Sequence, residues 1–446
     1  MIAIVGGGIA GLSAAYELSV RRIPFRLFEA SDRLGGLIRT ERIGAFTVEA
    51  GADSMLVQKR AAIDLCIELG LESHLIPTSA PRTAFVLKDG RLHPLPSPAM
   101  LGIPATWKGL LGFDLLPPSA RARLALEPLI PRRTDHDEES IGSFFARRFG
   151  QATVDLLAQP LLGGIYSGDV NALSLQELMP RLAQAENKGS VLRWVQRVAS
   201  SGDSGGAFRS LSGGMGELVD AMRERLAADS VELNATVDAI EPGWKLRTGA
   251  RQIACSAVIV ATPAHVAARL LAHVDPGSAE LCARTAYVST ASVVLGFPRH
   301  AVKHPLKGTG FVVARASHAG RMNACTWVSS KFSGRAPDDA VLIRAFFGGA
   351  LDPQAMALSD DELIALAIGE LTPVLSISGS PELARAYRWR NNSAQYDVFH
   401  SRRMEQLRQR LDRLPGLFVT GSGFKAVGVP DCVADGRATA AAASRL

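Results

Sequence analysis

The chain has 446 residues, of which 47% are hydrophobic and 21% are charged, and its formal net charge is +6. This length suits two or three domains with mainly aliphatic cores, since only 6% of the residues are aromatic. The basic residues are scattered and form no block, which disfavours nucleic acid as a partner and favours an anionic lipid surface or a carboxylated substrate.

Cysteine usage and hydropathy set further expectations. The five cysteines, none of them in a C-x-x-C pair or at metal-ligand spacing, predict a reducing compartment without a disulfide framework or a metal: Cys66, Cys255, Cys282, Cys325 and Cys432. The chain begins directly on an apolar strand, so we expect no signal peptide before the fold. It has no uninterrupted apolar run of the roughly 18 residues that a membrane span needs, so we expect none.

The first 29 residues predict a strand, a glycine turn, a helix and a second strand. Met1–Val5 and Pro24–Phe28 are apolar runs typical of buried parallel strands, and Leu12–Ser19 is rich in helix formers. The second strand closes on Glu29, eighteen positions after Gly11. This context predicts a dinucleotide-binding βαβ unit, with Glu29 placed to accept hydrogen bonds from an adenosine ribose.

The glycines of the turn follow the spacing G-x-G-x-x-G. Gly6 permits the tight turn, Gly8 lets a pyrophosphate approach the backbone, and Gly11 lets the helix pack closely on the strand. The helix that follows then directs its amides and its dipole toward the phosphates.

Two more small-residue segments follow the second strand. Residues 30–40 read ASDRLGGLIRT, and residues 49–54 read EAGADS. Together with the glycine turn they resemble the FAD-binding amino terminus of the amine oxidase and protoporphyrinogen oxidase superfamily. The resemblance implies FAD, bound non-covalently, in preference to NAD.

The next elements alternate between helix and hairpin. Residues 60–71 have apolar residues at helical spacing, and residues 83–87, 88–90 and 91–93 predict a strand, a turn and a returning strand. Residues 94–118 are rich in proline, leucine and tryptophan. We leave two interpretations open: a linker with a buried short helix, or an apolar surface in a membrane interface with Trp107 and Lys108 at headgroup level.

The middle of the chain predicts a helix, a glycine-rich segment and a loop. The acidic residues 135–139 lead into a helix over 141–149 and are expected to be solvated. Glycines at 163, 164 and 168 indicate backbone that passes close to another group, and Ser174 is a candidate helix cap. We expect a mobile loop over 186–207.

The remaining third alternates between strand-rich and helical patterns. Residues 211–218 open a helix, residues 231–240 predict alternating strands, and residues 255–262 predict a buried parallel strand. Four adjacent strand patterns then predict an antiparallel sheet, at 286–297, 308–314, 323–330 and 341–347. A helix over 360–371 follows, and a strand at 417–421, a glycine loop and a helix at 433–443 bring a second helix terminus to the FAD.

Motifs along the whole chain resemble the protoporphyrinogen oxidase family: GADS near residue 51, GRLHPLP at 90–96, LLGGIYSGDVNALSL at 161–175, FFGG at 346–349 and VGVPDCVADGRA at 427–438. The resemblance implies an α/β fold with α+β parts in three domains. A Rossmann-type FAD-binding domain would comprise 1–75, 207–265 and 385–446. An antiparallel-sheet substrate domain would comprise 76–95 and 266–384, and a helical membrane-binding insertion 96–206.

The resemblance implies oxidation of protoporphyrinogen IX to protoporphyrin IX in haem biosynthesis, by three hydride transfers to flavin N5 with oxygen reduced to peroxide. The alternative substrate is coproporphyrinogen III. The implied setting is cytoplasmic, with a peripheral membrane surface and a homodimer as candidate partners. The substrate's methylene bridges are doubly activated, so we assign no protein base as a catalytic residue.

The resemblance also carries onto individual residues. Arg82 aligns with an arginine that pairs with a propionate, and Gly164 with a glycine that faces the reacting ring. Val312, Trp327 and Phe346 fall where the family lines its cavity, although Trp327 departs from the expected aliphatic residue. Further cofactor contacts are expected at Gly6, Gly8, Ile9, Ala10, Gly11, Glu29, Ala30, Arg33, Gly35, Gly36, Gly51, Ala52, Asp53, Ser54, Val237, Trp389, Val427, Gly428 and Val429.

Two other functions stay open at this point. One is another flavin oxidase, acting on an amine or a carotenoid; an amine oxidase would usually show a lysine near the flavin, and the sequence places none there. The other is a prenyl-protein dissociation inhibitor that keeps this fold without flavin, which the intact glycine turn disfavours.

Overall fold

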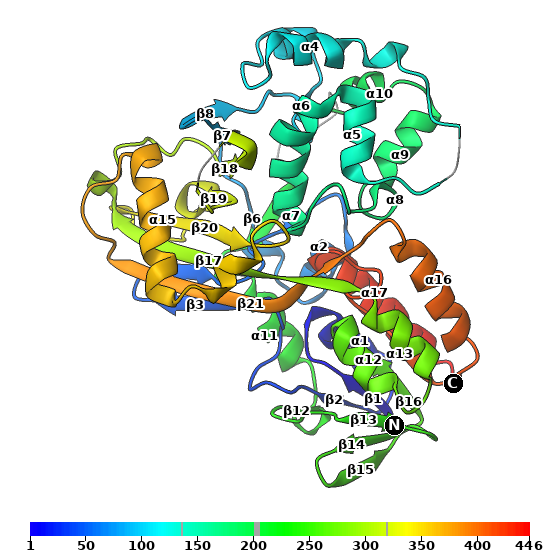
Figure 1. Cartoon of the computed structure of the whole chain (residues 1–446). Coiled ribbons are helices and arrows are strands. Elements are labelled where there is room, and N and C mark those ends of the chain that lie inside the picture. The colour runs from blue at the N-terminus through cyan, green and yellow to red at the C-terminus, as the bar shows by residue number, and fades with distance from the viewer. Residues whose placement is uncertain (135–136, 200–205, 318–319) are drawn as a thin grey trace.

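A computed structural model describes residues 1–134, 137–199, 206–317 and 320–446. It has a mixed α/β fold in which a parallel sheet carries both termini, a large sheet lies in the middle, and helices occupy the far end (Figure 1). Among these residues, no helix combines the length and the apolar composition that crossing a bilayer requires.

The parallel sheet has five strands and contains those predicted at 1–5, 24–28, 255–262 and 417–421. Its order is β12-β2-β1-β16-β22. The bounds are β1 Ile2–Val5, β2 Phe25–Phe28, β12 Val231–Glu232, β16 Ala257–Val260 and β22 Leu417–Val419. Every strand pair in it is parallel, which explains the continuous apolar runs, because both faces of such a sheet are covered.

Alternate residues of these strands enter two different cores. Ile2 and Ile4 pack with one group of helices, whereas Ala3 and Val5 pack with the other. The first group is α1 Ile9–Val20, α2 Ala61–Glu68, α11 Gly216–Glu224 and α17 Val429–Ala443. The second is α12 Ala264–Leu271, α13 Pro276–Ala283 and α16 His400–Leu411. The predicted helices at 60–71, 211–218 and 433–443 therefore cover this sheet.

The strands expected over 231–240 are interrupted. Only Val231–Glu232 joins the parallel sheet, and the chain then runs as a loop to β13 at Ala239–Glu241. Val237 thus lies in a loop and not in a strand. β13 begins a separate antiparallel sheet with β14 Lys245–Thr248 and β15 Arg251–Ala254.

The middle sheet has seven strands in the order β21-β17-β20-β19-β18-β7-β8. Their bounds are β7 Ala84–Lys88, β8 Arg91–Pro94, β17 Ala286–Pro298, β18 Gly310–Val313, β19 Ala324–Trp327, β20 Ala340–Gly348 and β21 Leu383–Gln395. Its pairs are antiparallel, as predicted, except that β18 pairs with β7 in parallel. The exception arises because the early hairpin β7–β8 adds to the edge of a sheet built by a much later part of the chain.

Three details of this sheet differ from the sequence expectation. β21 was not predicted, and the domain boundary expected between 384 and 385 falls inside it. The strand expected over 323–330 ends at Trp327, and α14 Val328–Lys331 follows. The predicted helix at 360–371 extends to Leu375 as α15, begins with a Ser359–Glu362 capping box, and covers one face of the sheet (Figure 1).

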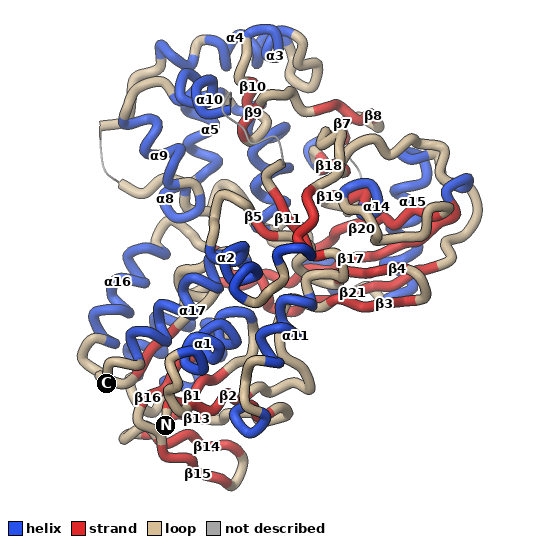
Figure 2. Tube along the Cα trace, turned by 180° about the vertical axis from the view of Figure 1, so that it is seen from behind, coloured by secondary structure: helices blue, strands red, loops and turns tan. Residues whose placement is uncertain are grey.

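The helical part lies at the end of the molecule opposite the termini in both views (Figures 1 and 2). Its helices are α3 Trp107–Leu111, α4 Pro118–Ala125, η2 Glu127–Leu129, α5 Ile141–Phe149, α6 Gln151–Thr153, the π-helical η3 Val154–Gly163, α7 Gly164–Tyr166, α8 Leu175–Leu178, α9 Pro180–Asn187 and α10 Val191–Ala199. Ser140 and Ser174 cap α5 and α8, so the expected cap at Ser174 is confirmed. Short strands β9 Ala99–Met100 and β10 Ile103–Pro104 precede these helices.

Two expectations for this part need correction. The segment 186–207 contains helix α10 and is not simply a loop; residues 200–205 lie outside the described residues. The acidic run was expected to be solvated: Asp137 is exposed, but Glu139 is buried and its carboxylate pairs with Arg147. Asp135 and the following residue lie outside the described residues.

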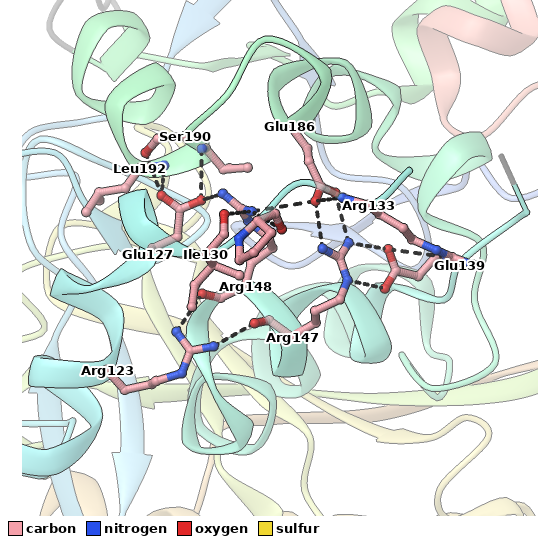
Figure 3. Close-up of polar contacts among 12 residues, drawn as sticks. Arg123, Glu127, Ile130, Arg133, Glu139, Arg147, Arg148, Glu186, Ser190 and Leu192 are labelled. Atoms are coloured by element: carbon pink, nitrogen blue, oxygen red, sulfur yellow. Dashed lines mark hydrogen bonds and ion pairs between the residues drawn. The ribbon is translucent and has the colours of Figure 1, made fainter. Parts of the chain in front are cut away.

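A buried ion network holds the helical part together (Figure 3). Arg148 and Glu127 form a fully buried ion pair, and Arg148 also donates to the Ile130 carbonyl at 2.9 Å. The Glu127 carboxylate accepts the amide N–H groups of Val191 and Leu192 at 3.0 and 3.1 Å. Glu127 therefore neutralises Arg148 and also supplies acceptors to the first turn of α10.

Smaller sheets connect these parts. β3 Thr40–Ile43 pairs with β4 Phe46–Glu49, and β11 Phe208–Leu211 lies between β5 Met55–Leu56 and β6 Leu75–Pro77. Together they place the segment 49–54 between the parallel sheet and the middle sheet.

Candidate active site

A cavity of about 660 Å³ opens beyond the carboxyl ends of the parallel strands, where ligands bind in doubly wound folds. Fourteen of the expected cofactor residues line it: Gly6, Gly8, Ile9, Ala10, Glu29, Ala30, Gly35, Gly36, Ala52, Ser54, Val237, Trp389, Gly428 and Val429. We call this space the dinucleotide cavity.

The turn between β1 and α1 requires its glycines. Gly6 has a φ of +105°, and a Cβ atom at Gly11 would lie 1.9 Å from the Gly6 carbonyl oxygen. By contrast, the nearest atom to a Cβ at Gly8 would be the Gly36 Cα at 4.0 Å. The first and third glycines thus serve close packing, and the second faces open space beside the cavity.

Two helix N-termini meet at the dinucleotide cavity. α1 begins after Gly8, and α17 begins after Gly428, whose φ of +96° turns the chain into the helix. Their unpaired first-turn amides and dipoles favour an anion. Glu29 stands beside them, and its Oε2 accepts the Gly7 amide at 2.6 Å. These features fit an adenosine diphosphate group, with the ribose toward the carboxylate.

Five expected cofactor residues do not line this cavity: Gly11, Arg33, Gly51, Asp53 and Val427. Arg33 instead donates to the carbonyls of Gly36 and Ile38 at 2.5 and 3.0 Å and so holds the 34–38 loop in place. Val427 directly precedes the cap of α17, and Gly51 lines the second cavity described below. Asp53 faces Lys331, a lysine that the sequence did not place near the cofactor.

Several residues of the dinucleotide cavity were not identified from the sequence: Thr262, Pro263, Val266, Arg269, Tyr287, Arg390, Asn391, Asn392 and Ser422. Arg269 and Arg390 add positive charge. The Tyr287 hydroxyl accepts the Ala264 amide at 2.8 Å and thereby supports the start of α12. Of these residues, only Thr262 and Pro263 had a sequence signal, because this pair stands at the end of the buried strand predicted over 255–262.

A second cavity, of about 250 Å³, lies between the middle sheet and the helical segment η3–α7. Leu37, Ala52, Trp389 and Asn392 line both cavities, so the two spaces adjoin there. Trp389 is fixed at this junction by its indole N–H, which donates to the Ala50 carbonyl at 2.9 Å. We call the second space the substrate cavity.

Two of the expected substrate residues, Gly164 and Phe346, line the substrate cavity. Val312 is not among the lining residues and packs against the apolar core of the helical part. A Cβ atom at Gly164 would meet only Val312, at 3.9 Å, so the backbone here is open. Gly163 and Gly168 are crowded instead: a Cβ at either would come within 2.4 Å of a glutamine side chain. Gly163 and Gly168 therefore mark close approach of the backbone to side chains, as predicted, whereas Gly164 does not.

Trp327 and Arg82 do not line the substrate cavity. Trp327 is fully buried on the opposite face of the sheet, with ring centroids 5.5 Å from Phe85 and 5.0 Å from His304. Strand alternation explains this, because Cys325 and Trp327 point into the core under α15 while Ala324 points into the cavity. Arg82 is exposed before β7, and its Nε donates to the Thr78 carbonyl at 3.0 Å.

Arg344 lines the substrate cavity and holds the 50–51 segment. Its guanidinium donates to the carbonyls of Gly51 and Ala50 at 2.7 and 2.9 Å and lies 4.7 Å from the Phe346 ring. Burial lowers the pKa of Arg344, while the charges of Asp53 and Glu49 oppose that shift. A Cβ at Gly51 would lie 1.7 Å from the Leu37 carbonyl oxygen, so this turn is also tightly packed.

Comparison with known proteins agrees with this architecture. The family described as flavin containing amine oxidoreductase matches residues 9–444. The coproporphyrinogen III oxidase of Bacillus subtilis is 35% identical over 98% of this chain and 96% of its own length. The protoporphyrinogen oxidase 2 of Arabidopsis thaliana is 26% identical over 98% and 92%.

A solved structure is also similar. The crystal structure of a protein from Exiguobacterium sp. 255-15, provisionally named protoporphyrinogen oxidase, superposes with a TM-score of 0.88 and 30% identity. The match covers 99% of this chain and 97% of that one. The chain therefore belongs to the flavin containing amine oxidoreductase family, and its dinucleotide cavity is built for FAD.

Proposed function

We propose that this chain oxidises coproporphyrinogen III to coproporphyrin III. The observation that carries the proposal is the set of bacterial relatives, 30–35% identical over 98% of this chain, that are named coproporphyrinogen III oxidase. The protoporphyrinogen oxidase 2 of Arabidopsis thaliana is 26% identical, and the Exiguobacterium protein with the provisional name protoporphyrinogen oxidase is 30% identical. Protoporphyrinogen IX, the first substrate expected from the sequence, becomes the second candidate.

The reaction removes six electrons and six protons from the tetrapyrrole in three two-electron steps, and three molecules of oxygen would become three of hydrogen peroxide. When bound, FAD supplies the hydride-accepting N5 position. The residues at the junction of the cavities, Leu37, Ala52, Trp389 and Asn392, would hold the reacting edge of the substrate next to that position.

The walls of the substrate cavity suit a wide apolar ring. Phe346, Ala324 and the open backbone at Gly164 offer surfaces without charge, and close packing around a bound ring would exclude water. Asp53 lies close to this junction, but its low pKa makes it a weak base. The proposal therefore assigns positioning and water exclusion to the protein, and no proton abstraction by a side chain.

The exposed apolar side chains of the helical part support a peripheral membrane surface. Trp107, Leu111, Leu126 and Leu129 are each at least half exposed, and Lys108 lies among them. Tryptophan and lysine are favoured at the headgroup level of a bilayer. We include this surface in the proposal, as a site of peripheral contact with anionic lipid.

The test is aerobic oxidation of both porphyrinogens by the purified flavoprotein, followed by porphyrin fluorescence. We expect a higher kcat/KM for coproporphyrinogen III than for protoporphyrinogen IX. A higher kcat/KM for protoporphyrinogen IX would make that compound the preferred substrate. A flavin-loaded protein that oxidises neither porphyrinogen would overturn the proposal. Putrescine and cyclohexylamine serve as substrates for the amine oxidase alternative and are expected to leave the flavin oxidised.

A further inference from the structure

Two cationic side chains are found among the described residues of the substrate cavity, Arg315 and Arg344. Arg344 is almost completely buried, and both of its terminal nitrogens donate to the carbonyls of the 50–51 segment. Its terminal nitrogens thus join the middle sheet to the cofactor turn, while its Nε has no hydrogen-bond partner among the described residues. Arg315, at the other end of the cavity, has a different environment.

Arg315 follows β18 directly and is held in position from one side. Its Nη1 donates to Asn323 Oδ1 at 3.0 Å, and the Asn323 amide in turn donates to the Gly348 carbonyl at 2.8 Å. This chain of hydrogen bonds fixes the guanidinium plane against the rim of the sheet. A guanidinium so fixed loses little conformational entropy when it binds an anion.

The charge of Arg315 is only partly compensated. Its Nη2 lies 3.8 Å from Asp352 Oδ2, beyond hydrogen-bond distance. Asp352 already accepts hydrogen bonds from Nε and Nη2 of Arg321, at 2.8 and 2.6 Å. The nearby Glu370 carboxylate accepts the amides of residues 321 and 322, at 2.7 and 3.1 Å. The Arg315 and Arg321 guanidinium groups therefore share Asp352. Arg321 is hydrogen-bonded to it, whereas Arg315, which lines the substrate cavity, is not.

The sheet order places Arg315 far from the junction with the dinucleotide cavity. Trp389 lies on β21, Arg315 follows β18, and strands β17, β20 and β19 lie between them. Four strand spacings of about 4.8 Å separate the two backbones by about 19 Å. A tetrapyrrole with one edge at the junction would extend toward Arg315 with its opposite pyrroles.

We propose that Arg315 binds a propionate of the substrate at the end of the cavity remote from the flavin. The inference rests on the proposed function. In coproporphyrinogen III every pyrrole carries a propionate, whereas in protoporphyrinogen IX two pyrroles carry vinyl groups instead. Arg315 is therefore a positioning and specificity residue: coproporphyrinogen III presents a carboxylate to it in every orientation of the ring, whereas protoporphyrinogen IX presents one only when a propionate-bearing pyrrole faces it.

The experiment compares Arg315→Gln, which removes the charge, with Arg315→Lys, which keeps it, and with Arg385→Gln as control. Arg385 is an exposed arginine on β21 whose Nη1 donates to the neighbouring Ala384 carbonyl. Each variant is measured for flavin absorbance, thermal unfolding, the Kd of coproporphyrin III from fluorescence titration, and KM and kcat for both porphyrinogens.

For Arg315→Gln we expect KM for coproporphyrinogen III and Kd for coproporphyrin III to rise about tenfold, which equals about 1.4 kcal/mol. Flavin content, unfolding temperature and kcat should stay unchanged, and KM for protoporphyrinogen IX should rise less. Arg315→Lys should recover part of the loss, and Arg385→Gln should match the unaltered protein.

Equal KM and Kd values in Arg315→Gln and the unaltered protein would overturn the inference while leaving the proposed function intact. An equal rise for both porphyrinogens would overturn the specificity role. A lowered unfolding temperature with no recovery in Arg315→Lys would show a structural role instead. If the unaltered protein oxidises neither porphyrinogen, the proposed function itself fails, while the Kd for coproporphyrin III still tests whether Arg315 binds a carboxylate.

Discussion

The ammonium group of Lys331 lies 3.0 Å from Asp53 Oδ2, although the two residues are 278 positions apart in the chain. Lys331 ends α14 below the middle sheet, and Asp53 stands between two residues that line the dinucleotide cavity. This ion pair thus fastens the substrate-side sheet to the cofactor turn. Burial alone would raise the pKa of Asp53, but the charges of Lys331 and Arg344 and two side-chain hydrogen bonds outweigh it and lower the pKa to about 2.

A pH dependence of flavin retention follows from this shift. The folded-state pKa lies below the ordinary value of 3.8, so the ionised Asp53 stabilises the fold above about pH 4, and that stabilisation is lost as the pH falls toward 2. Lys331→Met should raise the pKa of Asp53 and move acid-induced flavin release to a higher pH. Flavin fluorescence as a function of pH measures this release. Lys88→Gln, which removes an ion pair in the β7–β8 hairpin, is the control. Identical release curves for Lys331→Met and the unaltered protein would contradict this prediction.

The glycine turn predicts a sharp difference between two glycine-to-alanine changes. Gly11→Ala places a methyl group 1.9 Å from a carbonyl oxygen, so α1 must move away from β1 and we expect loss of FAD. Gly369→Ala, in the exposed middle of α15, meets nothing within 4 Å and should be neutral or stabilise the protein by up to about 1 kcal/mol. Flavin content after purification and the unfolding temperature separate the two. Full flavin content in Gly11→Ala would refute the packing argument.

The buried ion pair predicts a large loss of stability in the helical part. Glu127→Ala leaves Arg148 buried without its carboxylate and removes the acceptors at the start of α10, at a cost of about 3–5 kcal/mol. Thermal unfolding and limited proteolysis of the 186–199 region measure the effect. Glu405→Ala, which removes an exposed ion pair on α16, should change neither. Similar unfolding temperatures for the two variants would show that the buried network contributes little.

Substitution of Arg82 should change substrate binding, whereas substitution of Trp327 should change stability. Arg82→Ala should raise KM for the porphyrinogen and leave flavin content and stability unchanged, as the family resemblance implies. Trp327→Ala should cost about 3–5 kcal/mol of stability, because the indole fills the core between Phe85 and His304. Steady-state kinetics and thermal unfolding distinguish them. Unchanged kinetics in Arg82→Ala would remove that residue from the substrate site.

The apolar surface of the helical part predicts binding to lipid. Leu111 and Leu129 are 72% and 76% exposed, so replacing both with serine should leave the fold intact. The double variant should sediment less with vesicles that contain anionic lipid, and its activity on porphyrinogen dissolved in detergent should be unchanged. Equal sedimentation of the variant and the unaltered protein would rule out this surface.

The sequence by itself determined the elements whose signals are local. The glycine turn, the two strands around it and the helix that follows it were predicted from spacing and composition, because these features depend on neighbours a few residues away. The same holds for α5, whose bounds agree with the expected 141–149, and for the cap at Ser174. The flavin family followed from such local patterns taken together.

Only the tertiary structure decided which side chains share a cavity. Trp327 and Phe346 both lie in predicted strands, but the register of β19 and β20 puts one in the core and the other in the substrate cavity. Two of the residues that line both cavities, Trp389 and Asn392, lie on β21, a strand too rich in arginine and asparagine to be recognised. Pairing register and ion pairs such as Lys331–Asp53 join distant segments, and no local pattern contains them.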